Sequence, residues 1–454
     1  MSAILMRLEP SPVRENVAYS VLDYLSQPAI MVVAAPFLLR TLGTQQYGTW
    51  MLINSIAATA SGLGGGFGDS ATKYVSMYRG RNDRVGAARS VVAALTINCS
   101  LGLLAAAVVV ALAPLLIGHV FPVDPSLQTV GIVALRISAF VLLLRFVEAV
   151  FIAAVRGFEK YRPVVTISVS SRVVSVSFAV VLAARGLGLV AILWASLAIA
   201  IFSLLSQAWL AHSVLHHRGT WLATDIRAGL REVSSFGVFT WLKSVLGVLF
   251  AHADRLLVAA LLGTGPLAFY TLCSQITQPI HALLASGFNY LFPSLSARSA
   301  SGKWVETKNT YRTAALTSLG VVGAFCGFIT LASHTILRLW LGPAVARQYS
   351  GLLIAMAIGN GLLAICIVPH YTALALGRSR ALAFINLVAG SAALASCYLL
   401  IPHIGALGGG LAKILAGMVS LSVFAVVRSA FRQAATAQTS SEDFVTIASL
   451  DLAG

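Results

Sequence analysis

Apolar stretches of about 20 residues, separated by short polar loops, constrain this chain more than any other feature. Twelve can be delimited, at 17–39, 48–68, 90–117, 129–154, 163–184, 189–210, 236–262, 266–292, 311–333, 350–375, 381–402 and 410–430. A helix of about 20 apolar residues crosses a hydrocarbon layer roughly 30 Å thick. Because lipid offers the backbone no hydrogen-bond partners, such spans must be helices. The sequence therefore predicts an all-α integral membrane protein with about twelve transmembrane helices.

The composition excludes an ordinary soluble protein. Of the 454 residues, 58% are hydrophobic and only 10% are charged, which is far too apolar for a soluble core. The five cysteines all lie inside apolar stretches and form no CxxC pair. We therefore expect neither disulfides nor a metal site, and no cofactor. The first fifteen residues contain no cleavable signal, so the first span is expected to direct its own insertion.

An internal duplication divides the chain into two similar halves. At an offset of 220 positions, the following segments match: Leu42-Gly43-Thr44 with Leu262-Gly263-Thr264, Trp50 with Tyr270, Gly157 with Gly377, and Leu187-Gly188 with Leu407-Gly408. Agreement of separate glycine turns on one offset indicates a repeat, although similar turns in an unduplicated membrane protein are the alternative. Each half has an even number of spans, so both enter from the same side. We expect two parallel six-helix lobes around a central cavity, related by an axis along the membrane normal.

The expected organisation has five parts. They are a cytoplasmic N-terminus at 1–16, an N-lobe at 17–210, a connector at 211–235, a C-lobe at 236–430 and a tail at 431–454. The connector carries His212, Trp221 and three arginines around apolar positions, a pattern typical of an amphipathic segment on a membrane surface. The tail is rich in Ala, Thr and Ser and is predicted to be disordered and cytoplasmic.

The distribution of basic residues predicts the orientation. Loops on the side that holds both termini carry 21 Lys and Arg residues, whereas the opposite side carries four, Arg40, Arg185, Arg338 and Arg347. Basic loops remain in the cytoplasm, so both termini are expected there. Topology thus accounts for most of the net charge of +16, and no nucleic-acid partner is needed.

Charged residues inside the spans are costly, which makes them informative about function. Six are basic (Arg136, Arg145, Arg172, Lys243, Arg255 and Lys413) and three are acidic (Asp23, Glu148 and Asp254). Arg145 and Glu148 share one helix face and are expected to neutralise each other, while Lys413 is near enough to a helix end to snorkel. We predict that Arg136, Arg172, Lys243 and Arg255 bind an anionic substrate, such as a phosphate or carboxylate group. Bonds to backbone carbonyls or waters are the structural alternative.

The first span carries a polar stripe. Asn16, Ser20, Asp23 and Gln27 follow one another at steps of 4, 3 and 4, which places them on one helix face that must point toward protein or water. Asp23 also maps onto Lys243 at the repeat offset of 220, so a gate between them is one hypothesis. The other is that each is satisfied within its own lobe. Asp23, Asp254, Glu148 and His281 are the candidates for gating or ion coupling.

Catalysis is disfavoured. The sequence shows no nucleotide-binding motif in a strand–helix context, no Ser-His-Asp arrangement and no paired carboxylates, and the longest polar loop has about 25 residues. An ATPase or glycosyltransferase domain needs more chain than this. We expect a transporter without catalytic residues rather than an enzyme.

A set of short motifs resembles one family of transporters. In the first half they are Asn16-Val17-Ala18-Tyr19, Leu42-Gly43, Tyr47-Gly48-Thr49-Trp50, Gly66-Phe67-Gly68 and Tyr74-Val75-Ser76. In the second half they are Asp254-Arg255-Leu256-Leu257, Leu262-Gly263, Tyr270 and Leu291-Phe292-Pro293. Together, over about residues 10–430, they resemble the polysaccharide transporter branch of the multidrug/oligosaccharidyl-lipid/polysaccharide exporters, which includes Wzx-type O-antigen flippases.

The resemblance implies a flippase that moves a lipid-linked oligosaccharide, built on undecaprenyl diphosphate, from the inner to the outer leaflet by alternating access. Such a protein serves lipopolysaccharide O-antigen or exopolysaccharide biosynthesis. Its expected partners are the lipid-linked oligosaccharide, membrane lipids, a polysaccharide polymerase and a chain-length regulator. The alternatives are a cation-coupled multidrug exporter of the same superfamily, a non-transporting scaffold of a glycan assembly complex, and a glycan ligase or polymerase, which would require a longer outer loop.

Overall fold

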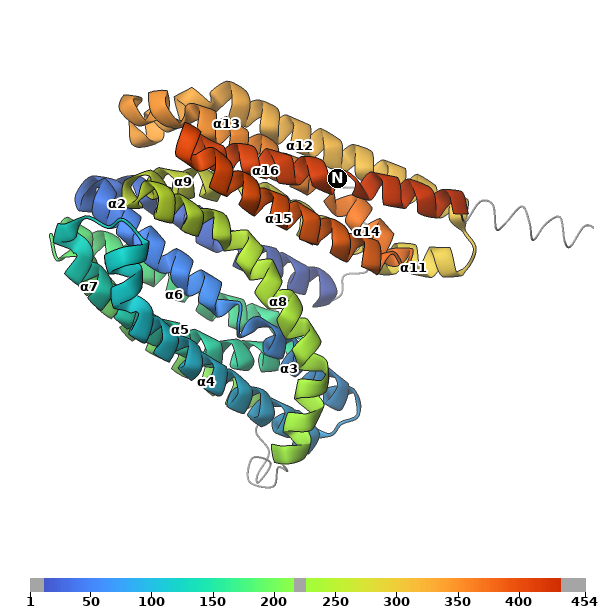
Figure 1. Ribbon diagram of the computed structural model, residues 1–454. Helices are drawn as coiled ribbons and strands as arrows, with labels where there is room; N and C mark the ends of the chain where they lie inside the picture. The colour runs from blue at the N-terminus through green and yellow to red at the C-terminus, as the bar shows by residue number, and fades with distance from the viewer. Residues whose placement is uncertain (1–11, 216–225, 434–454) are drawn as a thin grey trace, which may run out of the picture. The chain divides into compact units, whose positions relative to one another are not determined.

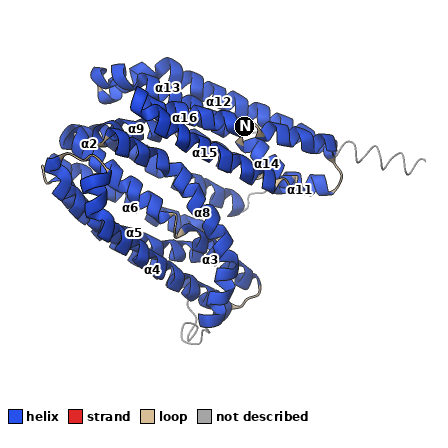
Figure 2. Cartoon of the chain, viewed as in Figure 1, coloured by secondary structure: helices blue, strands red, loops and turns tan. Residues whose placement is uncertain are grey.

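The computed structural model describes residues 12–215 and 226–433, and within them every regular element is a helix (Figures 1 and 2). The first half contains α2 (Pro12–Ser61), α3 (Gly65–Gly80), α4 (Arg84–Leu115), the short π-helix η1 (Leu116–Val120), α5 (Pro125–Gly157), α6 (Tyr161–Ala184) and α7 (Gly188–Leu215). The second contains α8 (Ile226–Leu262), α9 (Thr264–Thr277), α10 (Pro279–Phe288), α11 (Leu291–Ala300), α12 (Trp304–Leu341), α13 (Pro343–Ile365), α14 (Ile367–Ala375), α15 (Ser379–Ile404) and α16 (Ala406–Ser420). The prediction of an all-α protein is confirmed.

Ten helices in the described part of the chain are long and apolar enough to cross a membrane. The difference from the twelve expected spans has two local causes. Two predicted spans, 17–39 and 48–68, lie mostly within α2, whose helical run continues across a break at Gly43 and counts once. The predicted span 266–292 is divided among α9, α10 and the first residues of α11, because Pro279 begins a new helix.

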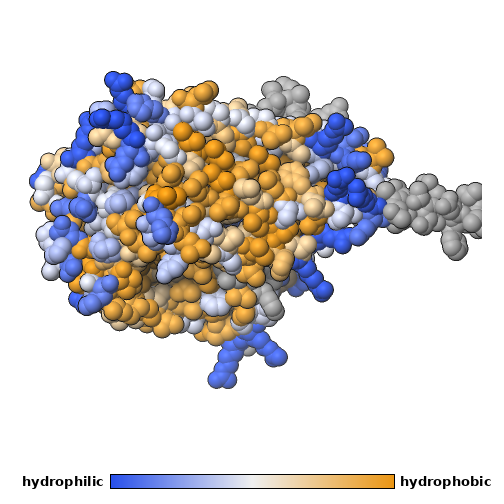
Figure 3. Space-filling view, turned by 45° about the horizontal axis from the view of Figure 1, so that its top comes forward, coloured by the Kyte–Doolittle hydropathy of each residue, from blue (hydrophilic) through white to orange (hydrophobic). Residues whose placement is uncertain are grey.

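Large apolar side chains on the outside of the helices fit a lipid environment. Leu331 is 88% exposed and Leu339 is 81% exposed, values that a water-soluble surface would not concentrate on one helix. Figure 3 shows apolar side chains over most of the face it displays. Between the helices of the first half, the apolar core includes Phe67, Val75 and Val150.

The predicted duplication is visible in the backbone. In the described part of the chain, eight of the ten residues with positive φ form pairs separated by 218 to 220 positions: Gly43 with Gly263, Asn82 with Gly302, Glu159 with Gly377, and Gly186 with Gly405; Gly188 and Gly342 have no such counterpart. Gly43 (φ 75°) and Gly263 (φ 84°) are the central residues of the two matching Leu-Gly-Thr motifs, and this region of φ favours glycine. Helices α4 and α12 begin at Arg84 and Trp304, again 220 apart. The repeat thus preserves both the helix order and the turns.

Two compact units divide the chain, residues 1–275 and 276–454. The predicted lobes are defined by the sequence repeat, with a connector at 211–235, and that division stays a prediction. Residues 211–215 end α7 and residues 226–235 begin α8, whereas 216–225 lie outside the described residues. The predicted N-terminal segment lies largely outside them as well, and of the predicted tail only 431–433 are described, as helix.

Helix α8 packs against α2, α3 and α4 within unit 1. It meets the break between α2 and α3, where residues 62–64 leave the helix. The indole Nε1 of Trp241 donates a hydrogen bond to the Leu63 carbonyl (2.7 Å), and the hydroxyl of Thr240 donates one to the Gly66 carbonyl (3.0 Å). Carbonyls at an interrupted helix lack donors from their own helix, and these two bonds from α8 supply them. The glycine-rich segment is therefore both a break and a packing site.

The beginning of α8 is attached to the same neighbours by a polar cluster. The Tyr78 hydroxyl donates to the Glu232 carboxylate at 2.7 Å and accepts from the Arg89 guanidinium at 2.8 Å. Burial raises the pKa of Tyr78 above its ordinary value, and the hydrogen bond to Glu232 adds to this while Arg89 opposes it. The phenol therefore stays protonated at neutral pH and remains a hydrogen-bond donor.

Unit 2 has its own apolar core. Ile280 of α10, Val322 of α12 and Ile367 of α14 are buried together. Two polar bonds connect the broken helices to their neighbours: the Asn360 amide donates to the Thr277 hydroxyl (2.9 Å), and the Tyr371 hydroxyl donates to the Ala285 carbonyl (3.1 Å). Both fix helix segments whose own hydrogen-bond ladders are interrupted near residue 278.

Candidate functional site

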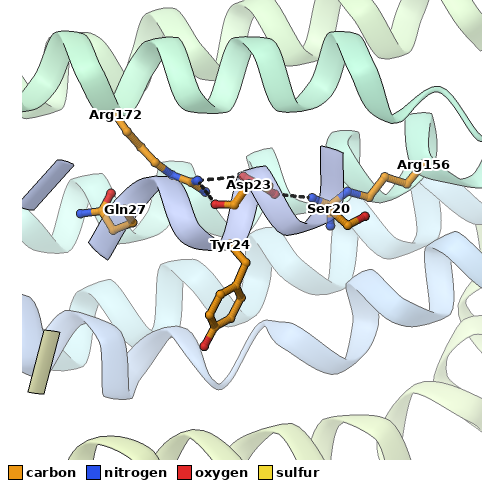
Figure 4. Close-up of a pocket in the computed structure, with 6 residues that line it drawn as sticks. All are labelled: Ser20, Asp23, Tyr24, Gln27, Arg156 and Arg172. Atoms are coloured by element: carbon orange, nitrogen blue, oxygen red, sulfur yellow. Dashed lines mark hydrogen bonds and ion pairs between the residues drawn. The ribbon is translucent and has the colours of Figure 1, made fainter. Parts of the chain in front are cut away.

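A pocket of about 320 Å³ lies among α2, α5 and α6 of unit 1. Its lining is polar in a chain that is otherwise mostly apolar, and consists of Ser20, Asp23, Tyr24, Gln27, Arg156 and Arg172 (Figure 4). Three members of the predicted polar stripe, Ser20, Asp23 and Gln27, are among them. The expectation that this stripe faces protein or water is confirmed.

The Asp23 carboxylate is held between two arginines. Its Oδ2 accepts from Nη2 of Arg156 at 2.7 Å, and its Oδ1 is 2.8 Å from Nη1 of Arg172. Figure 4 shows the Asp23 carboxylate between the two guanidinium groups, with Arg172 on its left and Arg156 on its right. Charge-assisted bonds of this kind are short and directional. Among the pocket's lining residues, two positive charges meet one negative charge.

Each arginine also has a support other than the carboxylate. Nη1 of Arg172 donates to the backbone carbonyl of Asp23 (2.6 Å) and to the Ser26 hydroxyl (2.7 Å). The Arg156 guanidinium lies over the Tyr161 ring, 5.8 Å from its centroid, which is a cation–π distance. The two cations are therefore positioned by a backbone carbonyl, a hydroxyl and an aromatic ring as well as by the carboxylate.

Local helix structure brings these side chains together. Arg156 lies in the last turn of α5, where the helix dipole favours a positive charge. Because the sequence places Arg156 after the predicted span 129–154, it is predicted there as a loop residue. The structure extends this helix to Gly157 and so adds Arg156 to the site. The only sequence signal for it is its position just beyond the end of an apolar stretch.

A second buried polar cluster joins α5, α6 and α7. Glu148 is 2% exposed; its Oε2 accepts from Arg145 at 2.5 Å and its Oε1 accepts from the Ser203 hydroxyl at 2.5 Å. The Ser171 hydroxyl donates to Ser203 at 3.0 Å. The predicted pairing of Arg145 with Glu148 is confirmed. The pair neutralises a carboxylate that would otherwise be costly to bury.

The remaining predicted site residues do not gather in this pocket. Arg136 is exposed and makes no hydrogen bond or ion pair with the residues that the structure describes. Nη2 of Arg255 donates to the Ser274 hydroxyl at 3.2 Å, and buried Asp254 accepts from the Tyr270 hydroxyl at 2.7 Å. His281 is exposed on α10 of unit 2. Of the seven predicted residues whose side chains the structure describes, the pocket brings together Asp23 and Arg172.

The hypothesis of an Asp23–Lys243 gate stays a prediction. Both carboxylate oxygens of Asp23 are engaged by arginines of α5 and α6, as in the alternative in which each residue is satisfied within its own lobe. The side chain of Lys243 lies outside the described residues. Within the described chain, no group of three or more His, Cys, Asp or Glu side chains is arranged to hold a metal ion.

Comparisons with solved structures show what the fold is similar to. An inward-facing multidrug resistance MATE family transporter of the MOP superfamily matches with a TM-score of 0.69 at 15% identity, over 94% of this chain and 96% of that one. Lipid II flippase MurJ in an inward closed conformation matches with a TM-score of 0.70 at 15% identity, over 92% and 90%. A mutant of the Vibrio cholerae MATE transporter VcmN matches at 0.64 and 16% identity, over 93% and 97%. At these identities the likeness establishes a shared fold.

The family comparison rests on sequence. No curated protein matches the chain. Residues 13–298, more than half of the 454 residues, match the family described as polysaccharide biosynthesis protein. The chain belongs to the polysaccharide biosynthesis protein family, and its fold is that of membrane transporters.

Proposed function

We propose that this protein is a flippase that moves a lipid-linked oligosaccharide, carried on undecaprenyl diphosphate, from the inner to the outer leaflet of the bacterial cytoplasmic membrane. It would act by alternating access, with both termini in the cytoplasm, and serve O-antigen or exopolysaccharide synthesis. The observation that carries the proposal is the pocket in which Arg156 and Arg172 converge. The family assignment adds support, since its description names polysaccharide biosynthesis.

The chemistry of the pocket suits a phosphorylated headgroup. Guanidinium groups bind phosphate oxygens through paired N–H donors, and two of them from different helices can contact both phosphoryl groups of a diphosphate. Their charge exceeds that of Asp23 by one, so an anion entering the pocket meets a net attraction. Ser20 and Gln27 line the same space and offer hydrogen-bonding groups of the kind that sugar hydroxyls use.

Other intramembrane charges take secondary roles in this proposal. Arg136, Lys243 and Arg255 would offset headgroup charge along its path, and Asp254, Glu148 or His281 would carry a coupling ion. A polymerase and a chain-length regulator are the proposed protein partners, because the product of flipping must be polymerised on the outer side. Export of cationic drugs fits the site less well, since Asp23 and Glu148 are already neutralised by arginines.

The test is genetic and chemical, in the organism that carries the gene. Deletion is expected to abolish surface polysaccharide and to accumulate lipid-linked repeat units that periodate reaches only after the membrane is opened. Arg156→Gln and Arg172→Gln are expected to reproduce both effects at normal protein levels. The matched control is Arg185→Gln, since Arg185 is exposed at the end of the same helix as Arg172 and should export normally.

Three results would refute the proposal. If deletion abolishes polysaccharide export but the Arg156→Gln/Arg172→Gln double variant exports normally, the protein acts as a scaffold. Intact surface polysaccharide in the deletion strain, together with higher sensitivity to cationic dyes, would indicate a multidrug exporter. Accumulated repeat units that periodate reaches in intact cells would place the defect after flipping.

A further inference from the structure

The pocket already contains an anion, and that anion belongs to the chain. The two oxygens of the Asp23 carboxylate face Arg156 and Arg172, 2.7 Å and 2.8 Å away. A phosphoryl group that bridged the same two guanidinium groups would need the positions these oxygens occupy, because Oδ2 accepts a hydrogen bond from Arg156 and Oδ1 lies in ion-pair contact with Arg172, without a hydrogen bond of its own. A bound phosphoryl group and the Asp23 contacts are therefore mutually exclusive at this place.

The carboxylate is the contact that can be given up most easily. Nη1 of Arg172 carries two hydrogens and faces three oxygens: the Asp23 carboxylate, the Asp23 backbone carbonyl and the Ser26 hydroxyl. If the carboxylate left, two acceptors would remain for two hydrogens. Arg156 would keep its position over the Tyr161 ring. The two cations therefore do not depend on Asp23 for their placement.

The site is also accessible and has an unused donor. The side chains of Asp23 and Arg156 are 15% and 32% exposed, and that of Arg172 is 29% exposed, so the pair is reached through the pocket. Nε of Arg156 is buried and has no hydrogen-bond partner among the described residues. A buried donor without an acceptor costs free energy, and a multi-oxygen anion in the pocket could satisfy it where one carboxylate does not.

We propose that Asp23 is an internal competitor for the substrate's diphosphate, so that the headgroup binds by exchanging with the carboxylate and leaves when the carboxylate returns to the arginines. This inference rests on the proposed function, and adds to it the means by which a strongly cationic pocket releases its ligand. Without a competitor, two arginines would hold a diphosphate tightly, and tight binding of the ground state slows turnover. Asp23 is thus a positioning residue that sets the balance between binding and release.

Binding of inorganic pyrophosphate to the purified full-length protein in detergent, measured by calorimetry, tests the exchange directly. Asp23→Asn keeps the shape of the side chain and removes its charge, and is expected to bind pyrophosphate about tenfold more tightly than the natural protein. Asp23→Glu restores a competing carboxylate and should bring the affinity back toward the natural value. Glu306→Gln is the matched control, because Glu306 is exposed, 58% of its side chain, and pairs only with Lys303 among the described residues.

The tighter pyrophosphate binding expected for Asp23→Asn must depend on the two arginines. Adding Arg156→Gln and Arg172→Gln to Asp23→Asn is expected to abolish it. In a flipping assay with reconstituted protein, Asp23→Asn should lower both KM and kcat, because substrate binds better and leaves more slowly. A folding defect would lower kcat without tightening pyrophosphate binding, so thermal unfolding of each variant is recorded alongside.

Two outcomes overturn the exchange. One is equal or weaker pyrophosphate binding by folded Asp23→Asn. The other is tighter binding that survives loss of both arginines, since the probe would then bind elsewhere. Neither outcome touches the proposed function, which fails separately if Arg156→Gln/Arg172→Gln leaves polysaccharide export unchanged.

Discussion

Replacing Gly66 with alanine should loosen the packing of α8 on α3. A Cβ built on Gly66 would lie 2.1 Å from the backbone nitrogen of Trp241 and 2.2 Å from its Cα, where ordinary contacts begin at 3.4 Å. Both atoms belong to the backbone of α8, so no side chain can rotate to make room. The helix itself has to move away from α3.

The loss in free energy of unfolding follows from the contacts that this movement of α8 breaks. Overpacking a well-packed contact costs about 1–3 kcal/mol. Moving α8 also stretches the bonds from Thr240 to Gly66 and from Trp241 to Leu63, each contributing about 0.5–1.5 kcal/mol. We therefore expect Gly66→Ala to lower the free energy of unfolding by roughly 2–6 kcal/mol, from these two sources together.

The same helix provides the control. Gly68 is also inside α3, and a Cβ there would meet nothing within 4 Å. Gly68→Ala should be neutral or stabilise the protein by about 0.5–1 kcal/mol, the usual helix preference for alanine over glycine. The assay is reversible unfolding in mixed detergent micelles, followed by tryptophan fluorescence, which also reports on Trp241. An unfolding midpoint for Gly66→Ala equal to or above that of Gly68→Ala would refute the close approach of α8.

Three further substitutions test other contacts. Tyr78→Phe removes the hydroxyl between Glu232 and Arg89 and should cost about 1 kcal/mol of unfolding free energy, with no loss if the cluster is not formed in the membrane. Glu148→Leu removes the buried charge and leaves only the Ser203 hydroxyl without its acceptor, so it should cost about 1–3 kcal/mol. Arg145→Gln instead leaves the buried Glu148 carboxylate without its counter-charge and should cost more, about 3–5 kcal/mol; equal costs would contradict the burial of Glu148. Gly263→Ala forces a side chain to adopt φ 84° and should destabilise by about 1–2 kcal/mol, while Gly247→Ala, inside α8 with open space around it, should not.

The repeat and the helix order could be predicted from sequence because glycine turns leave a residue signature at fixed spacing. Gly43 and Gly263 are recognisable as a pair in the sequence and adopt the same left-handed conformation in the structure. Helix breaks inside apolar stretches are harder to predict from the sequence. Glycines such as those at 62–64 allow both bending and close packing, so composition does not decide between a break and a continuous helix. The break there depends on contacts with another helix, such as that of Trp241 with Leu63.

The site was predicted in part. The 4-3-4 spacing of the polar stripe on the first span places Asp23 and Gln27 on one helix face, and the cost of burying Arg172 in lipid makes it a candidate; all three line the pocket. Arg156 was missed because span prediction ends where hydropathy falls, whereas α5 continues to Gly157. Pairing between helices is beyond the sequence, which does not indicate that two arginines of α5 and α6 contact the Asp23 carboxylate. The pairing of Asp23 with Lys243 stays a prediction.

The contact of α8 with the α2–α3 break bears on how the protein is made. The chain emerges from the ribosome with residues 62–64 inserted long before Trp241 has been synthesised. Until then the carbonyl of Leu63 lacks the indole donor it has in the finished protein, and a carbonyl without a donor costs free energy unless water or a chaperone supplies one. Helices α2 to α7 on their own should therefore be an unfinished intermediate, exposed to membrane quality-control proteases until α8 is synthesised.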